Sequence, residues 1–213
     1  MAKWQLFTET WDGNVINASQ WTGTFGTVTS SGGAMNLVVN TGATNYSGID
    51  SVGTYDLTSS FYQIQLVNGG NQSLTSLEVY IIQLLTGSTS KLIWYLNQNT
   101  LKCFKTVASV QTQVGSNLTY DSTLHKYFRI RELDGSIYWD YSRDGIGWTN
   151  QTSTATPITI TALYSEPTAG TFGTEASGTT IILDNLNVIP GNGIRKTINS
   201  GLRPHPFSPG IAR

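Results

Sequence analysis

The chain has 213 residues, with 12 Lys or Arg, 13 Asp or Glu and a formal net charge of −1. This balance excludes the strong electric field that gathers nucleic acid or an anionic membrane, so we expect neither as a partner. A single cysteine, Cys103, and two histidines exclude a disulfide framework and a Cys-rich zinc site, and we expect no metal and no cofactor.

Strand patterns follow one another along the chain. We expect strands over residues 35–40, 61–66, 77–85, 91–96, 101–107, 126–131, 136–141, 158–165 and 179–189. Residues 61–66 and 126–131 alternate between apolar and polar side chains, whereas 77–85 and 91–96 are more continuously apolar, as strands covered on both faces are. Asp134 and Gly135 separate two alternating runs and predict a hairpin.

The hairpin pattern continues in Ser142-Arg143-Asp144-Gly145-Ile146-Gly147-Trp148. We expect Asp144 to cap this turn through its carboxylate, Gly145 to take a positive φ and Trp148 to pack behind the turn.

Many strand patterns without alternating helices predict an all-β fold, a two-sheet antiparallel sandwich. The patterning is continuous from Trp4 to about Val188, which predicts one domain over residues 1–190. The composition changes at Pro190, and residues 191–213 form a basic tail rich in Pro and Gly.

Several sequence runs resemble the concanavalin-A-like lectin/glucanase (laminin-G-like) jelly-roll modules of tailed-phage virion proteins and bacterial surface proteins. The resemblance covers about Trp4 to Ile189 and rests on residues 7–37, 50–60, 71–78, 125–132, 138–148 and 184–188. It implies a jelly roll. It carries no catalytic residue onto this chain, because the matching runs are mostly turns and core aromatics.

Carboxylate pairs suited to glycoside hydrolysis are not evident in the sequence. β-Sandwich hydrolases of the laminarinase type carry their carboxylates on one strand, in a Glu-x-Asp-x-Glu or similar pattern, and such pairs lie roughly 5–10 Å apart. Glu132 and Asp134 have the first spacing but no third carboxylate follows, and Asp140 and Asp144 lead into a turn. We therefore predict no catalytic residue and no enzyme.

Aromatic side chains are the candidate sugar-binding groups, because an aromatic face suits the apolar face of a pyranose. Tryptophan is more often a core residue in a sandwich, so we expect most of the six to be buried. For an exposed concave face, the candidates are Tyr46, Trp94, Tyr95 and Tyr141.

Three functions remain open: a virion structural or decoration protein, a carbohydrate-binding module for a host-surface glycan, and a glycosidase. No basic segment followed by an apolar stretch opens the sequence, so we expect no secretory signal. This favours the first function, a protein made in the host cytoplasm and carried in a virion, with other virion proteins and copies of itself as partners. The tail would anchor it through Arg195, Lys196, Leu202, Arg203, Phe207, Ile211 and Arg213.

Overall fold

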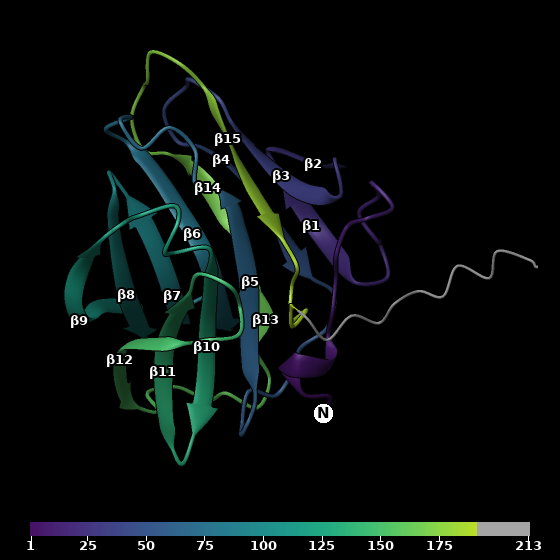
Figure 1. Cartoon of the computed structure of the whole chain (residues 1–213), viewed down its shortest axis with the longest axis vertical. Coiled ribbons are helices and arrows are strands. Elements are labelled where there is room, and N and C mark those ends of the chain that lie inside the picture. Colours follow the sequence, from purple (N-terminus) through teal and green to yellow (C-terminus); the bar gives the residue numbers. More distant parts are fainter. Residues whose placement is uncertain (191–213) are drawn as a thin grey trace, which may run out of the picture.

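A computed structural model describes residues 1–190 (Figure 1). The predicted anchoring tail, residues 191–213 with Arg195, Lys196, Leu202, Arg203, Phe207, Ile211 and Arg213, lies outside the described residues.

Two antiparallel sheets pack face to face. The eight-stranded sheet has the order β1-β4-β14-β6-β7-β8-β9, with β13 paired to β6. Its strands are β1 (Trp21–Phe25), β4 (Asn45–Ser51), β6 (Leu77–Thr86), β7 (Ser90–Asn97), β8 (Thr100–Val107), β9 (Val110–Thr119), β13 (Tyr164–Ser165) and β14 (Thr168–Thr171). A short 3-10 helix, Trp4–Leu6, precedes β1.

The seven-stranded sheet has the order β12-β11-β10-β5-β15-β3-β2. In Figure 1 its strands β5 and β10 lie in front of the fainter β7 and β8 of the other sheet. Its strands are β2 (Thr27–Ser31), β3 (Ala34–Val39), β5 (Phe61–Asn68), β10 (Tyr127–Leu133), β11 (Ser136–Ser142), β12 (Thr149–Ala155) and β15 (Thr179–Asp184). The predicted all-β, two-sheet sandwich is confirmed.

The core lies between the two sheets. Trp4, Trp11, Trp21, Trp94 and Trp139 are buried there, as expected of most of the tryptophans. Two indole groups also bond across the core: Trp94 Nε1 donates to the Arg129 carbonyl at 3.1 Å, and Trp139 Nε1 donates to the Ile93 carbonyl at 3.0 Å. These bonds satisfy buried donors and link β7 to β10 and β11.

Both predicted turns form. The hairpin between β10 and β11 closes through Asp134 and Gly135, with φ values of 50° and 75°, a backbone conformation that Asp and Gly accept at low cost. Asp144 Oδ1 accepts the backbone N–H groups of Ile146 and Gly147, both at 2.9 Å, and Gly145 has a φ of 73°.

Two predicted strands differ from the structure. Within residues 158–165 only Tyr164 and Ser165 are a strand; Ile160 is buried instead as part of a loop, and its carbonyl accepts the N–H of Leu57. The last strand ends at Asp184, because Asn185 takes a φ of 50°, which breaks an extended chain.

Several strands were missed in the sequence because they carry little apolar patterning. The outermost strands β9 and β12 are made largely of exposed Ser, Thr, Asn and Gln side chains. An edge strand with few core-facing side chains has no alternation to detect. Within residues 1–190, no helix has the length and apolar character that a membrane crossing requires.

Candidate functional site

An open cleft of about 550 Å³ lies on the outer face of the eight-stranded sheet. Strands β1, β4, β6, β7, β8 and β14 contribute to it, and its lining includes Phe25, Tyr46, Tyr80, Gln83, Lys91 and Glu166. The cleft therefore crosses the middle of the sheet, on the side turned away from the seven-stranded sheet.

Two glycines make room for aromatic rings in this face. A Cβ atom on Gly48 would lie 2.4 Å from Cζ of Phe25, and one on Gly170 would lie 2.3 Å from Cδ1 of Tyr46. Each ring thus packs directly over a strand backbone that has no side chain of its own. The Tyr46 side chain remains half-exposed beside the cleft.

A pair of carboxyl groups, Asp50 and Glu166, meets in the cleft. Thr168 pairs with Gly48 across β14 and β4, so in this antiparallel register Glu166, two residues before Thr168, lies opposite Asp50, two residues after Gly48. Burial raises the pKa of both groups above their ordinary values, and the neighbouring Asp50 charge raises that of Glu166 further.

Polar neighbours orient Glu166. Gln83 Nε2 donates to Glu166 Oε1 at 2.5 Å, and the Glu166 N–H donates to the Gln83 carbonyl at 2.9 Å. The positive charge of Lys91 lowers the pKa of Glu166, but by less than burial raises it. Oδ1 of Asp50 is buried without a hydrogen-bond partner among residues 1–190, so the pair keeps an unused acceptor.

The second acidic position is Glu78, whose carboxylate is surrounded by phenol groups. Tyr46 and Tyr95 donate to its two oxygens at 2.5 and 2.8 Å, and Tyr80 adds a longer bond of 3.3 Å. Burial, and then the Glu78 charge, raise the pKa values of all three phenols, so they remain donors at neutral pH.

A bulge in β6 places these groups on one face. The register between β6 and β7 shifts between Tyr80 and Ile82, so Ile82 is buried and Gln83 faces the cleft with Glu78 and Tyr80. Glu78 pairs with Gly170, and Glu166 lies four residues earlier along β14. The Cα atoms of Glu78 and Glu166 are therefore about 13 Å apart along the sheet.

The four predicted sugar-binding residues separate into two sets. Tyr46 and Tyr95 lie together around Glu78, but the prediction that Tyr95 is exposed is wrong, because it is buried, and of the two only Tyr46 is open to the cleft. Trp94 points into the core with an exposed fraction of 0%, because successive side chains of a strand alternate, so it cannot stack on a sugar. Tyr141 lies on β11 in the other sheet, where its ring packs against His125 at 4.7 Å.

Sequence reasoning missed Asp50, Glu78 and Glu166. The motif expected of a glycosidase has several carboxylates on one strand, whereas the structure brings these three together from β4, β6 and the segment before β14. The one available signal was Glu78 itself, a charged residue inside an otherwise apolar strand. The carboxylates that the sequence did single out, Glu132 and Asp140, belong to the seven-stranded sheet.

No family model and no curated protein matches this sequence. Solved structures do match the fold. A Bacillus licheniformis β-glucanase has a TM-score of 0.64 at 12% identity, covering 84% of this chain and 95% of its own. A laminarinase from Flavobacterium sp. UMI-01 has a TM-score of 0.63 at 7% identity, covering 84% of this chain and 98% of its own. SCLam, a non-specific endo-β-1,3(4)-glucanase from family GH16, has a TM-score of 0.64 at 6% identity, covering 85% of this chain and 89% of its own.

These likenesses establish a concanavalin-A-like jelly roll and correct two predictions. The prediction of a non-enzymatic virion structural protein is wrong, because the similar structures are glycoside hydrolases and none of those three is named as a virion protein. The prediction that the chain is not an enzyme is wrong for the same reason: it depended on the absence of a carboxylate motif within one strand, whereas the similar structures are glycoside hydrolases.

Proposed function

We propose that this chain is a glycoside hydrolase that binds a β-glucan-like polysaccharide across the cleft of the eight-stranded sheet. The observation that carries the proposal is the position of Glu166 in the cleft, with Asp50 next to it and with Glu78 hydrogen-bonded to the cleft-lining Tyr46 and Tyr80. The fold similarity to a β-glucanase and a laminarinase supports the choice of substrate class.

The carboxyl groups differ in the way that acid and base roles require. Burial raises the pKa values of Asp50 and Glu166, which is the direction that a proton donor requires, so this pair is the candidate general acid for the leaving sugar oxygen. Glu78, stabilised by three phenol donors, is the candidate base.

The positions of these groups assign them to two sides of the substrate. Asp50 and Glu166 adjoin each other and are too close to act on opposite sides of a sugar ring, so they would function as one acid. Glu78, whose Cα atom lies about 13 Å from that of Glu166 along the sheet, would act from the other side of the ring.

Aromatic and polar groups of the face would hold the substrate. Tyr46 and Tyr80 line the cleft, and the buried Tyr95 supports Tyr80 edge to face at 5.2 Å between ring centroids. Such rings suit the apolar faces of pyranoses, and the amide of Gln83 suits their hydroxyl groups.

The test is the release of reducing ends from laminarin and from mixed-linkage β-glucan. We expect turnover by the wild-type chain and a loss of about 100-fold or more in Glu166→Gln and in Glu78→Gln, as for removal of a general acid or base. Asp134→Asn is the matched control, because it removes one carboxylate from an exposed turn of the other sheet.

Two results would contradict the proposal. One is binding of these glucans without any release of reducing ends, which would leave a sugar-binding role only. The other is turnover that Glu166→Gln and Glu78→Gln do not lower relative to Asp134→Asn.

A further inference from the structure

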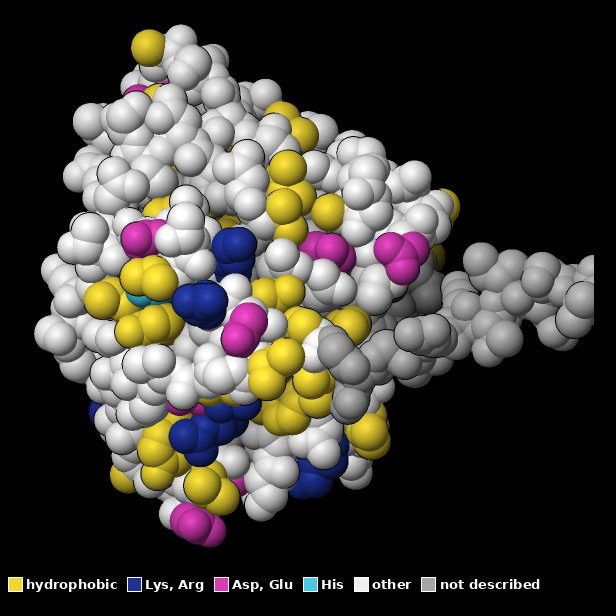
Figure 2. Space-filling model, viewed as in Figure 1, with side chains coloured by type: hydrophobic (Ala, Val, Ile, Leu, Met, Phe, Trp, Pro, Cys, Tyr) yellow, Lys and Arg dark blue, Asp and Glu magenta, His cyan; other side chains and the backbone are white. Residues whose placement is uncertain are grey.

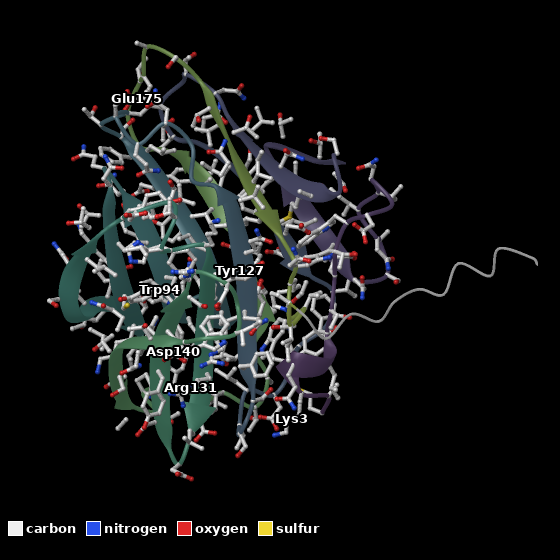
Figure 3. All side chains as sticks on the ribbon, in the orientation of Figure 1. Lys3, Trp94, Tyr127, Arg131, Asp140 and Glu175 are labelled. Carbon is white, nitrogen blue, oxygen red and sulfur yellow. The ribbon has the colours of Figure 1, made fainter. Side chains whose placement is uncertain are left out.

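A second polar cluster lies on the outer face of the seven-stranded sheet, remote from the cleft. Arg129 donates to Oδ2 of Asp140 from Nε at 3.0 Å and Nη2 at 2.8 Å, and Arg131 donates to the same oxygen from Nε at 2.7 Å. Asn150 Nδ2 donates to Oδ1 at 3.0 Å. Figure 3 shows Arg131 beside Asp140, over β10 and β11. One buried carboxylate therefore faces two guanidinium groups.

Aromatic rings hold both guanidinium groups in place. The guanidinium carbon of Arg129 lies 4.1 Å from the ring centroid of Trp148, and that of Arg131 lies 4.0 Å from that of Tyr138. Phe61 pairs with Arg131 from β5. Figure 2 shows Lys and Arg side chains bordered by hydrophobic side chains on the lower part of this face. The cations are thus fixed by stacking before any ligand arrives.

Arg131 has hydrogen-bond donors that are unpaired in the described part of the chain. Within residues 1–190 its bond to Asp140 uses Nε alone, and neither terminal nitrogen has a hydrogen-bond partner. These two nitrogens form the planar fork that matches a carboxylate or a sulfate. A hollow of about 180 Å³ adjoins the side chain, and its lining includes Gln5, Ser59 and Phe61, which supply an amide, a hydroxyl and an aromatic ring.

A carboxylate at the edge of this hollow does not occupy the fork. Glu132 faces inward by the alternation of β10 and is buried, and its two oxygens accept the backbone N–H groups of Ser59 and Gly135. Arg129 and Arg131 exceed the charge of Asp140 by one, and the Glu132 carboxylate at the edge of the hollow offsets that excess. The terminal nitrogens of Arg131, rather than a net positive charge, therefore make this surface suited to an anion.

We propose that Arg131 and the adjoining hollow bind a carboxylate or sulfate group of an acidic sugar. The fork takes the anionic group, Ser59 and Gln5 reach its hydroxyl neighbours, and Phe61 and Tyr138 flank the sugar ring. This site is separate from the hydrolytic cleft and does not depend on the proposed hydrolase activity. The polar donors and flanking rings favour a sugar over an acidic peptide.

The test is retardation in native gels that contain polygalacturonate or chondroitin sulfate, with polyglutamate as the peptide comparison. We expect retardation by at least one polysaccharide, weakened about tenfold in Arg131→Gln, because bonds to charged groups are worth about 1.5–3 kcal/mol. Arg131→Lys should recover only part of it, since lysine keeps the charge and loses the fork. Arg143→Gln is the matched control, because Arg143 is exposed in the turn after β11.

Two features of the experiment distinguish a loss of anion binding from misfolding and from a failure of the hydrolase proposal. Asp140 retains both bonds from Arg129 in Arg131→Gln, and Glu166→Gln should be retarded like the wild-type chain. The proposal is overturned if neither polysaccharide retards the protein, if Arg131→Gln and Arg143→Gln behave alike, or if only polyglutamate retards it.

Discussion

The outer faces of the two sheets both carry carboxyl groups that are withdrawn from water, and the two faces stabilise these groups by different contacts. On the seven-stranded sheet, the buried carboxylate of Asp140 is neutralised by Arg129 and Arg131. On the eight-stranded sheet, Asp50 and Glu166 lie against each other, and the side-chain bonds that Glu78 accepts within residues 1–190 come from phenol groups. Guanidinium groups neutralise the carboxylate on one face, whereas burial beside a second carboxyl group raises the pKa of Asp50 and Glu166 on the other.

The comparison separates a structural acid from candidate catalytic acids. Asp140 is paired, buried and fully hydrogen-bonded, so removing it should cost stability. Asp50 and Glu166 keep a raised pKa at an open cleft, so removing them should cost activity and change the pH dependence of stability.

The largest loss of stability is expected from a substitution of Asp140. Asp140→Asn leaves two partly buried guanidinium groups without their counter-charge, and we expect a loss of about 3 kcal/mol in the free energy of unfolding. Urea unfolding followed by tryptophan fluorescence measures it. A loss below about 0.5 kcal/mol would mean that the ion pairs on this face are not structural.

A substitution of Gly170 tests how the Tyr46 ring packs over β14 beside the cleft. Gly170→Ala places a Cβ against the Tyr46 ring, and we expect a loss of about 1–3 kcal/mol from overpacking. In the double variant Gly170→Ala/Tyr46→Ala the clash with the ring is absent and only the 2.6 Å approach of the Cβ to the Asn45 carbonyl oxygen remains, so the loss should be smaller than the sum of the two single losses. Additive losses in the four-protein cycle would show that the ring does not contribute to the clash.

The pH dependence of stability sharpens the contrast between the two faces. Because the folded pKa values of Asp50 and Glu166 lie above their ordinary values, their contribution to stability is present below about pH 4 and is lost as the pH rises through the folded pKa values. The double variant Asp50→Asn/Glu166→Gln should therefore lose less stability than the wild-type chain between pH 4 and pH 7. Urea midpoints at both pH values measure this. Equal losses of stability in the double variant and the wild-type chain would contradict the raised pKa values of Asp50 and Glu166.

The smallest effect is expected in the turn that belongs to neither cluster. Asp134→Asn should change the free energy of unfolding by less than about 0.5 kcal/mol, because Asn-Gly is as well suited as Asp-Gly to this hairpin and the residue is exposed. Thermal unfolding checks it. A large loss would disqualify this variant as the activity control.

Much of the fold was predictable because core-facing strands carry their own pattern. Residues 61–66 and 126–131 alternate as β5 and β10 do, and Asp134-Gly135 marks the turn that the structure contains. The polar strands β9 and β12 were not predictable, since their positions depend on pairing with β8 and β11 rather than on burial.

The site was predictable only in part. Tyr46 and Tyr95 were chosen as exposed aromatics and do lie together, but their neighbour Glu78 is meaningful only once β4, β6 and β7 are aligned. The Asp50–Glu166 contact joins residues more than 100 positions apart through the register of β4 and β14. The bulge that turns Gln83 toward them leaves no mark in an apolar run.

The most direct measurement is a crystal structure of Glu166→Gln with a bound glucan oligosaccharide. The account predicts sugar rings across β4, β14, β6 and β7, with a glycosidic oxygen within hydrogen-bond reach of residue 166 and Glu78 on the opposite side of the cleaved bond. An oligosaccharide bound only on the seven-stranded sheet, or one in the cleft with no glycosidic oxygen near residue 166, would contradict it.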